Sequence, residues 1–256
     1  VINETFTMML AARLGLNVPK VWHLYLPEPA FIIERFDRAP GTEEPLRLHV
    51  LDGTQMLNEP SYNKYSSETF PKLKDLIEQC RNKAAARLET FRWIVFNTMV
   101  GNSDSHLKNI SFIVGHEGIS VAPFYDLLCT AVYHTRVFLD EGAVWPNEKL
   151  ASPVAGANFF SEVTFDKLIA TGLELGLSKS AAVREVVKIV GRLAGAADEI
   201  IAQLESILAD PAAPQGAPSP MTKAAERRML RSIRSIVIAD MLRYVRLPVA
   251  AAKEPQ

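Results

Sequence analysis

The chain has 256 residues, 48% of them hydrophobic, and a formal net charge of −1. It can therefore bury a substantial core, as one large domain or two closely packed lobes, and its charge gives no general reason to expect a nucleic acid or a membrane surface as partner. Its two cysteines, Cys80 and Cys129, indicate neither a disulfide framework nor a zinc site and fit a reducing cytoplasm. The longest apolar stretch, residues 93–100, is too short to span a membrane.

The N-terminal part of the sequence predicts one helix and two strands. Residues 3–14 carry apolar side chains near helical spacing. Residues 21–26 and 31–36 are rich in β-branched and aromatic residues, and the prolines between them predict an antiparallel pair of strands. We therefore expect a small remnant of an N-terminal lobe at residues 1–45 and a helical C-terminal lobe at residues 46–256.

The second of these units is expected to be mainly helical. Helices are predicted at residues 48–57, 67–79, 84–100, 165–175, 179–208 and 221–246. The third helix is apolar on too many sides for a surface helix, so we expect it at the centre of the lobe. Residues 110–114 and 119–122 predict a β-hairpin. A short helix and an irregular segment to residue 157 follow Asp126, and a proline-rich segment at residues 210–220 separates the last helix.

A polar loop at residues 101–109 (GNSDSHLKN) follows the central helix directly and is the most informative part of the sequence. Asp104 and Asn109 stand five positions apart. This is the spacing by which a kinase catalytic loop places a carboxylate at the substrate hydroxyl and an amide oxygen on Mg²⁺. Asp126 would be the second metal ligand, because the predicted hairpin brings the residues on its two sides together. The pattern predicts a phosphotransferase site.

Phosphoryl transfer requires positioning and charge neutralisation more than covalent chemistry. Asp104 would accept the proton of the substrate hydroxyl or orient it, while Asn109 and Asp126 would supply the oxygen ligands that Mg²⁺ prefers. Lys108 would neutralise the transferred phosphate, and His106 would help to hold the loop. Taken singly, these residues are ordinary turn and cap formers. Their order together with a buried helix and a hairpin favours the functional interpretation.

The last predicted helix has a basic side that could bind a nucleic acid or an acidic partner. This side is made of Lys223, Arg227, Arg228, Arg231, Arg234, Arg243 and Arg246. The opposite side is apolar, and such a pattern is typical of a helix that packs on its own domain with a solvated basic face. We favour that second interpretation.

Two segments resemble the HipA family of bacterial Ser/Thr kinases, the toxin components of two-gene toxin–antitoxin modules. Residues 102–109 (NSDSHLKN) and 122–128 (APFYDLL) are similar to the catalytic and metal-binding motifs of that family. Residues 33–38 (IERFDR) look like its hinge strand, residues 64–65 like the entry to its helical lobe, and residues 150–155 like a later segment. The resemblance covers nearly the whole chain, although the helices beyond residue 175 match only in pattern.

This resemblance implies an α+β, two-lobed protein-kinase-like fold that transfers the γ-phosphate of ATP to a protein Ser or Thr with Mg²⁺. It implies that Asp104 is the catalytic aspartate and that Asn109 and Asp126 hold Mg²⁺. The adenine would meet the backbone of the hinge residues Glu34, Arg35 and Phe36. A protein substrate is implied, with an aminoacyl-tRNA synthetase as a candidate, and so is a small DNA-binding antitoxin as a candidate partner.

Full-length members of that family carry further elements before the segment that matches Val1 to Glu4. These are a glycine-rich loop over the phosphates, a phosphate-binding lysine and a loop serine that is autophosphorylated. Because the sequence starts at Val1, within a predicted helix, we expect a fragment with weak or absent ATP turnover on its own. Two alternatives stay open. One is a catalytically incomplete module that binds an antitoxin or another protein, and the other is a metal-dependent phosphoesterase that uses Asp104, His106 and Asp126.

Overall fold

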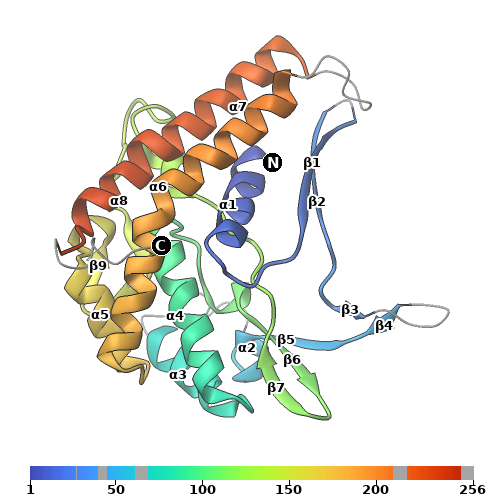
Figure 1. The fold of residues 1–256 in the computed structure, drawn as a ribbon, viewed down its shortest axis with the longest axis vertical. Helices are drawn as coiled ribbons and strands as arrows, with labels where there is room; N and C mark the ends of the chain where they lie inside the picture. Colours follow the sequence, from blue (N-terminus) through green and yellow to red (C-terminus); the bar gives the residue numbers. More distant parts are fainter. Residues whose placement is uncertain (27, 40–44, 61–68, 210–217, 249–256) are drawn as a thin grey trace.

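A computed structural model describes residues 1–26, 28–39, 45–60, 69–209 and 218–248. In Figure 1 the long helices lie on the left, the strands of residues 21–121 (β1 to β7) lie on the right and below, and β9 (Ala157–Phe159) lies among the helices beside α5 (Phe165–Glu174). The first predicted helix is confirmed as α1 (Ile2–Arg13). It packs against both long C-terminal helices, α6 (Lys179–Ala209) and α7 (Pro220–Ser232), and against the first β-hairpin. Phe6 of α1 is completely buried, so this helix belongs to the core.

The predicted pair of N-terminal strands is confirmed, but its second strand is shorter. β1 (Val21–Tyr25) and β2 (Pro29–Ile33) are antiparallel, with Val21 opposite Ile33. Residues 34–36, which we expected at the end of this strand, lie outside it. The Arg35 guanidinium bonds the carboxylate of Asp37, which lies in a turn, so the chain bends where the strand pattern continues. Pro27 lies outside the described residues.

Residues 48–57 do not form the predicted helix. They form strand β5 (His49–Asp52) and one helical turn, α2 (Gly53–Met56). β5 pairs with a strand of the following hairpin along its whole length, and this tertiary pairing outweighs a helical pattern that is too short to persist alone. The Asp52 side chain then accepts hydrogen bonds from two backbone amides of α2, which fixes the residue at which that helix begins.

The core is built on three helices, α4 (Lys83–Met99), α3 (Thr69–Gln79) and α5 (Phe165–Glu174), of which the last two pack on the first. Phe91, Trp93 and Phe96 of α4 are at most 1% exposed, which confirms the central helix predicted from the sequence. The predicted helices at residues 165–175 and 179–208 are confirmed as α5 and α6. Residues 64–65, which resemble the entry to the helical lobe, lie outside the described residues.

The predicted β-hairpin is confirmed as β6 (Ser111–Gly115) and β7 (Gly118–Val121), and β5 adds a third strand along the β6 edge. The short helix expected after Asp126 does not form. The chain runs without regular structure to a 3₁₀ turn, η3 (Ala131–His134). The Asn3 side chain accepts from the backbone amide of Cys129 and donates to its carbonyl, so these two groups cannot join a helical ladder.

The segment expected to be irregular up to residue 157 contains a hairpin. It consists of β8 (Lys149–Val154) and β9 (Ala157–Phe159), and a 3₁₀ turn, η4 (Phe160–Glu162), follows. The register of this pair shifts between Lys149 and Val154, which explains why the sequence shows no regular alternation there. A further two-stranded ribbon joins β3 (Arg38–Ala39) and β4 (Leu46–Arg47).

The last helix is continuous, as predicted, but its middle is a π-helical segment. α7 is followed by η5 (Ile233–Ile238) and α8 (Ala239–Tyr244). Its apolar side is buried, and the basic side bonds the protein itself: Arg234 binds Asp198 at 2.7 Å, and Arg228 lies 5.1 Å from the centre of the Phe138 ring. The structure thus confirms a packed helix. Within the described ranges, no helix is long and apolar enough to cross a membrane.

Candidate active site

The polar loop (residues 101–109) starts at a backbone position that only glycine fits. Gly101 has φ +69°, and a Cβ atom there would lie 2.5 Å from Val237 and 2.9 Å from Ala131. Asn102 then bonds twice to Asn97 of α4, through its backbone amide to the carbonyl at 2.9 Å and through its side chain at 2.7 Å. Asn97, which interrupts the apolar helix, therefore anchors the loop that follows.

Asp104 is held by its backbone and presents its side chain to solvent. Its amide donates to the side-chain oxygen of Asn102 at 3.0 Å, and Asn102 is only 3% exposed. The Asp104 side chain is 45% exposed, and His106 Nε2 lies 3.7 Å from its Oδ1. A fixed backbone with an accessible carboxylate suits a group that must meet an external hydroxyl.

Asn109 ends the loop in a 3₁₀ turn, η2 (Leu107–Asn109), and is bonded back to the predicted catalytic residue. Its side-chain nitrogen donates to the backbone carbonyl of Asp104 at 2.9 Å. This bond fixes the orientation of the amide, so the side-chain oxygen is the atom that can bind a cation. Lys108, in the same turn, is half-buried and forms no ion pair with any residue that the structure describes.

Tyr125 joins the segment of Asp126 to the polar loop. Its hydroxyl donates to the Lys108 carbonyl at 2.9 Å and lies 2.7 Å from the Ser111 hydroxyl. At the open end of the hairpin, the amide of Ala122 donates to the Ser111 carbonyl at 2.8 Å. These bonds bring two segments together that are far apart in sequence, as predicted. Asp126 has φ +55°, a left-handed conformation that Asp tolerates better than most residues.

The three hinge residues have different surroundings. Phe36 stacks on Tyr125, with ring centres 5.7 Å apart and an angle of 23° between the rings, so it lies beside the segment of Asp126. The Glu34 amide donates to the carbonyl of Lys20 at 2.9 Å. The side chains of Glu34 and Arg35 are exposed, and the structure therefore brings only Phe36 of this group into contact with the site.

The charge of Asp126 acts on two neighbouring titratable groups. Burial first, and the charge of Asp126 second, raise the pKa of Glu4 on α1 above its ordinary value. Burial also raises the pKa of Tyr125, and the charges of Asp52 and Asp126 contribute in the same direction. A cation bound at Asp126 would relieve this repulsion.

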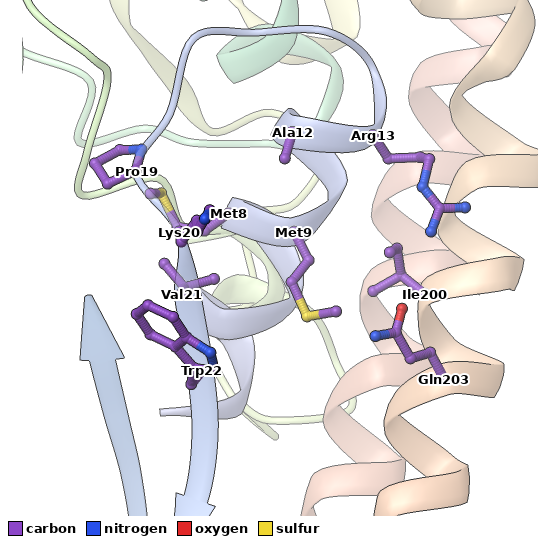
Figure 2. A pocket seen from close by; sticks show the side chains of 10 residues that line it. All are labelled: Met8, Met9, Ala12, Arg13, Pro19, Lys20, Val21, Trp22, Ile200 and Gln203. Carbon is purple, nitrogen blue, oxygen red and sulfur yellow. The ribbon is translucent and has the colours of Figure 1, made fainter. Parts of the chain in front are cut away.

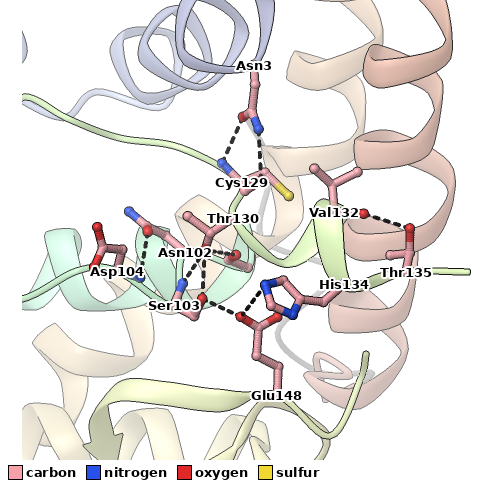
Figure 3. A network of polar contacts seen from close by, with 11 residues as sticks. Asn3, Asn102, Ser103, Asp104, Cys129, Thr130, Val132, His134, Thr135 and Glu148 are labelled. Atoms are coloured by element: carbon pink, nitrogen blue, oxygen red, sulfur yellow. Dashed lines mark hydrogen bonds and ion pairs between the residues drawn. The ribbon is translucent and has the colours of Figure 1, made fainter. Parts of the chain in front are cut away.

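Several residues that build the loop were not singled out from the sequence (Figure 3). The Ser103 amide donates to the Thr130 hydroxyl at 2.6 Å, and the Ser103 hydroxyl donates to the carboxylate of Glu148. The sequence does carry a signal for two other residues: Asn97 interrupts the apolar stretch at residues 93–100, and Tyr125 lies within the motif at residues 122–128. Thr130 and Glu148 carry no such signal, because they reach the loop only through the tertiary fold.

A cavity of about 500 Å³ lies elsewhere, between α1, β1 and α6 (Figure 2). Met9, Trp22 and Ile200 are among its lining residues, and none of the predicted site residues lines it. Among the described residues there is no group of three or more His, Cys, Asp or Glu that could hold a metal ion. A cation at the polar loop would thus depend on few protein ligands.

The chain is similar to known proteins over most of its length. The family profile described as "HipA-like C-terminal domain" matches residues 1–200. The serine/threonine-protein kinase toxin HipA of Shewanella oneidensis is 30% identical over 229 residues, which are 83% of this chain and 51% of that protein. The chain thus spans about half the length of this curated relative.

Solved structures support the same assignment. The complex of Shewanella oneidensis HipA and HipB with operator DNA contains a chain that matches with a TM-score of 0.76 and 26% identity, covering all of this chain and 58% of that one. The Helicobacter pylori proinflammatory kinase CtkA matches with a TM-score of 0.59 at 15% identity, over 96% of this chain and 84% of its own, which concerns the fold alone. The predicted α+β, kinase-like fold is confirmed. The chain belongs to the family of HipA-like C-terminal domains.

Proposed function

We propose that this chain carries the acid and metal-binding part of a HipA-like Ser/Thr protein kinase, which transfers the γ-phosphate of ATP to a protein hydroxyl with Mg²⁺. We assign residues 1–45 to its N-terminal lobe and residues 46–256 to its C-terminal lobe. Strand β3 of the first part pairs with strand β4 of the second. The observation that carries the proposal is the pair of contacts made by the Tyr125 hydroxyl, which links the Asp126 segment to Lys108 and Ser111.

Each residue of the loop then has a separate task. Asp104 receives the hydroxyl of the substrate and orients it or takes its proton. His106, whose side chain is 6% exposed, supports Asp104 from inside the loop. Lys108 carries a positive charge next to Asn109, where a transferred phosphate needs neutralisation.

The residues present fit Mg²⁺ better than a metal that needs many protein ligands. Asn109 and Asp126 offer hard oxygen atoms, and Mg²⁺ is usually held by one or two carboxylates with phosphates and water. When bound, the ion neutralises the phosphate oxygens during transfer. A phosphoesterase that uses Asp104, His106 and Asp126 requires a denser ligand set than the described residues provide.

The hinge residues complete the nucleotide site in this proposal. Phe36 and Tyr125 form a stacked aromatic pair beside Asp126, a surface on which a flat base can pack. The backbone around Glu34, Arg35 and Phe36 meets the adenine edge. By similarity to the HipA relatives, an antitoxin such as the HipB of the solved complex is a candidate partner, and a protein with an accessible Ser or Thr is the substrate class.

Titration calorimetry of the 256-residue chain with a non-hydrolysable ATP analogue tests this function. We expect tighter binding with Mg²⁺ than without it, and loss of that difference in Asp126→Ala, because a metal ligand is removed. Asp104→Asn should keep the coupling to Mg²⁺, since Asp104 acts on the hydroxyl.

Asp140→Ala is the matched control, because Asp140 is an exposed carboxylate outside the site and its removal should change nothing. Equal affinity with and without Mg²⁺ would count against the kinase proposal and favour a module that only binds a protein partner. Coupling that survives Asp126→Ala would exclude Asp126 as a ligand.

A further inference from the structure

Glu148 stands apart from the predicted site in sequence but contacts the polar loop in space. Its Oε1 accepts a hydrogen bond from the Ser103 hydroxyl, and Ser103 precedes Asp104 directly (Figure 3). Glu148 is 9% exposed, and its Oε2 is buried without a hydrogen-bond partner among the described residues. Burying a carboxylate that is only partly bonded is costly, so this position calls for an explanation beyond packing.

The carboxylate stands directly before a β-hairpin that is separate in sequence from the loop. Glu148 precedes β8, and its backbone carbonyl accepts from the Phe160 amide at 3.1 Å, next to the pairing of Lys149 with Phe159. The side chain is therefore carried by the β8–β9 hairpin, which is independent of the loop itself. Groups built on regular elements hold a site more accurately than groups built on loops.

Ser103 passes this support to the backbone of the loop. Its amide donates to the Thr130 hydroxyl at 2.6 Å, and the Thr130 hydroxyl donates to the Gly101 carbonyl at 3.2 Å. Asp104 then donates its own amide to the side chain of Asn102. The loop is thus held from two sides, by α4 through Asn102 and by the hairpin through Glu148.

We propose that Glu148 is a positioning residue for Asp104, acting through the hydroxyl of Ser103. It does not touch the reacting groups. Its role is to hold the backbone before Asp104, so that the carboxylate meets the substrate hydroxyl in a fixed geometry, and small misplacements of such groups cost about 100-fold in rate. This inference rests on the proposed kinase function, since Asp104 needs accurate placement only if it acts on a substrate.

A set of four variants tests the inference: Glu148→Ala, Glu148→Gln, Ser103→Ala and the double variant Glu148→Ala with Ser103→Ala. The first readout is the backbone amide signal of Asp104 in ¹H–¹⁵N spectra and its rate of hydrogen exchange. We expect Glu148→Ala and Ser103→Ala to shift this signal alike and to speed exchange, with no further change in the double variant. Glu148→Gln should stay close to wild type, because its amide oxygen still accepts from Ser103.

The second readout is phosphoryl transfer by the kinase. We expect kcat to fall by about 10-fold to 100-fold in Glu148→Ala and Ser103→Ala, with little change in the KM for Mg-ATP, and to recover in Glu148→Gln. Glu226→Gln, a change at a buried carboxylate far from the loop in sequence, should lower stability without moving the Asp104 signal.

The two readouts separate the two proposals. If the wild-type chain binds the nucleotide equally well with and without Mg²⁺, the kinase proposal fails, while the spectra still decide whether Glu148 holds the loop. An unchanged Asp104 signal in Glu148→Ala, or additive effects in the double variant, would overturn the inference. If Glu148→Ala does not fold, Ser103→Ala must speed hydrogen exchange at Asp104, because a shift of the neighbouring signal alone follows from any replacement of Ser103. Unchanged exchange there overturns the inference as well.

Discussion

Glu148 and Glu226 are two glutamates of similar burial, 9% and 6% exposed, in very different surroundings. Glu226 on α7 accepts from the Tyr25 hydroxyl with one oxygen, and its other oxygen lies 3.2 Å from His23 Nε2. Glu148 has one oxygen bonded to Ser103, and the nearest cationic candidate, His134, is 3.8 Å away with a side chain that is 45% exposed.

The difference shows what each carboxylate contributes. The Glu226 cluster, formed by His23, Tyr25 and Glu226, joins the β1–β2 hairpin to the last helix and is closed to solvent. One Glu226 oxygen accepts the Tyr25 hydrogen bond, and the other lies within ion-pair distance of His23 Nε2, which makes no hydrogen bond with any described residue. Glu148 keeps one oxygen without a hydrogen bond in the described part of the chain, beside the loop that we propose meets the substrate. We infer that Glu226 contributes mainly to the stability of the fold. Glu148 lowers stability, because its carboxylate is buried and only partly bonded, but it fixes the position of the loop.

The largest effect is expected from breaking the Glu226 cluster. Glu226→Ala should lower the free energy of unfolding by about 3–5 kcal/mol, because it leaves His23 and Tyr25 buried without their partner. Urea denaturation measures this loss. Glu205→Ala is the control, since it removes a solvent-accessible contact with Arg231 that is worth about 0–1 kcal/mol. Similar losses in the two variants would contradict a stabilising cluster.

The start of the polar loop should be nearly as sensitive. Gly101→Ala is expected to cost about 3 kcal/mol, because the new methyl group meets Val237 and Ala131 in addition to the left-handed backbone. Gly142 also has a positive φ, +79°, but open space around it, so Gly142→Ala should cost only about 1 kcal/mol. Thermal unfolding compares the two. In Gly101→Ala, the Mg²⁺-dependent part of nucleotide binding should weaken as well. If both substitutions lower the unfolding free energy equally, Gly101 is not closely packed against Val237 and Ala131.

The smallest expected effect is the pH dependence at Glu148. Burial raises the pKa of this carboxyl above 4.5, although the Ser103 hydroxyl and then the charge of His134 oppose the shift. The folded state therefore binds the proton more tightly than the unfolded chain. The contribution of Glu148 to stability is greatest below pH 4.5 and is lost as the pH rises through the raised pKa.

This sign can be measured with Glu148→Gln, which does not titrate. The unfolding free energy of wild type minus that of the variant should fall as the pH rises from below 4.5 through the raised pKa. Ser103→Ala should make the decline with pH steeper than in wild type, because it removes the bond that lowers the pKa. If the unfolding free energies of wild type and Glu148→Gln change in parallel with pH, folding does not raise the pKa of Glu148.

Much of the fold could be predicted because its elements are determined locally. The buried helix α4 is recognisable from its continuous apolar surface, and the β6–β7 hairpin from two apolar runs with glycines between them. β5 was mistaken for a helix, since its strand conformation depends on the edge of β6, which lies about 60 residues later in the chain. The irregular segment after Asp126 was missed because the Asn3 side chain, 126 residues earlier in the chain, holds Cys129.

The sequence alone determined the chemical inventory of the proposed site: a carboxylate at Asp104, an amide at Asn109 and a carboxylate at Asp126, with a spacing that suits phosphoryl transfer. Spacing along the chain carries this information because the loop and hairpin are local structures. The tertiary structure decided which residues hold that inventory in place, namely Tyr125 between the two segments and Glu148 behind Ser103. These contacts join elements distant in sequence, and hydrogen bonds across such distances leave no periodic pattern to read.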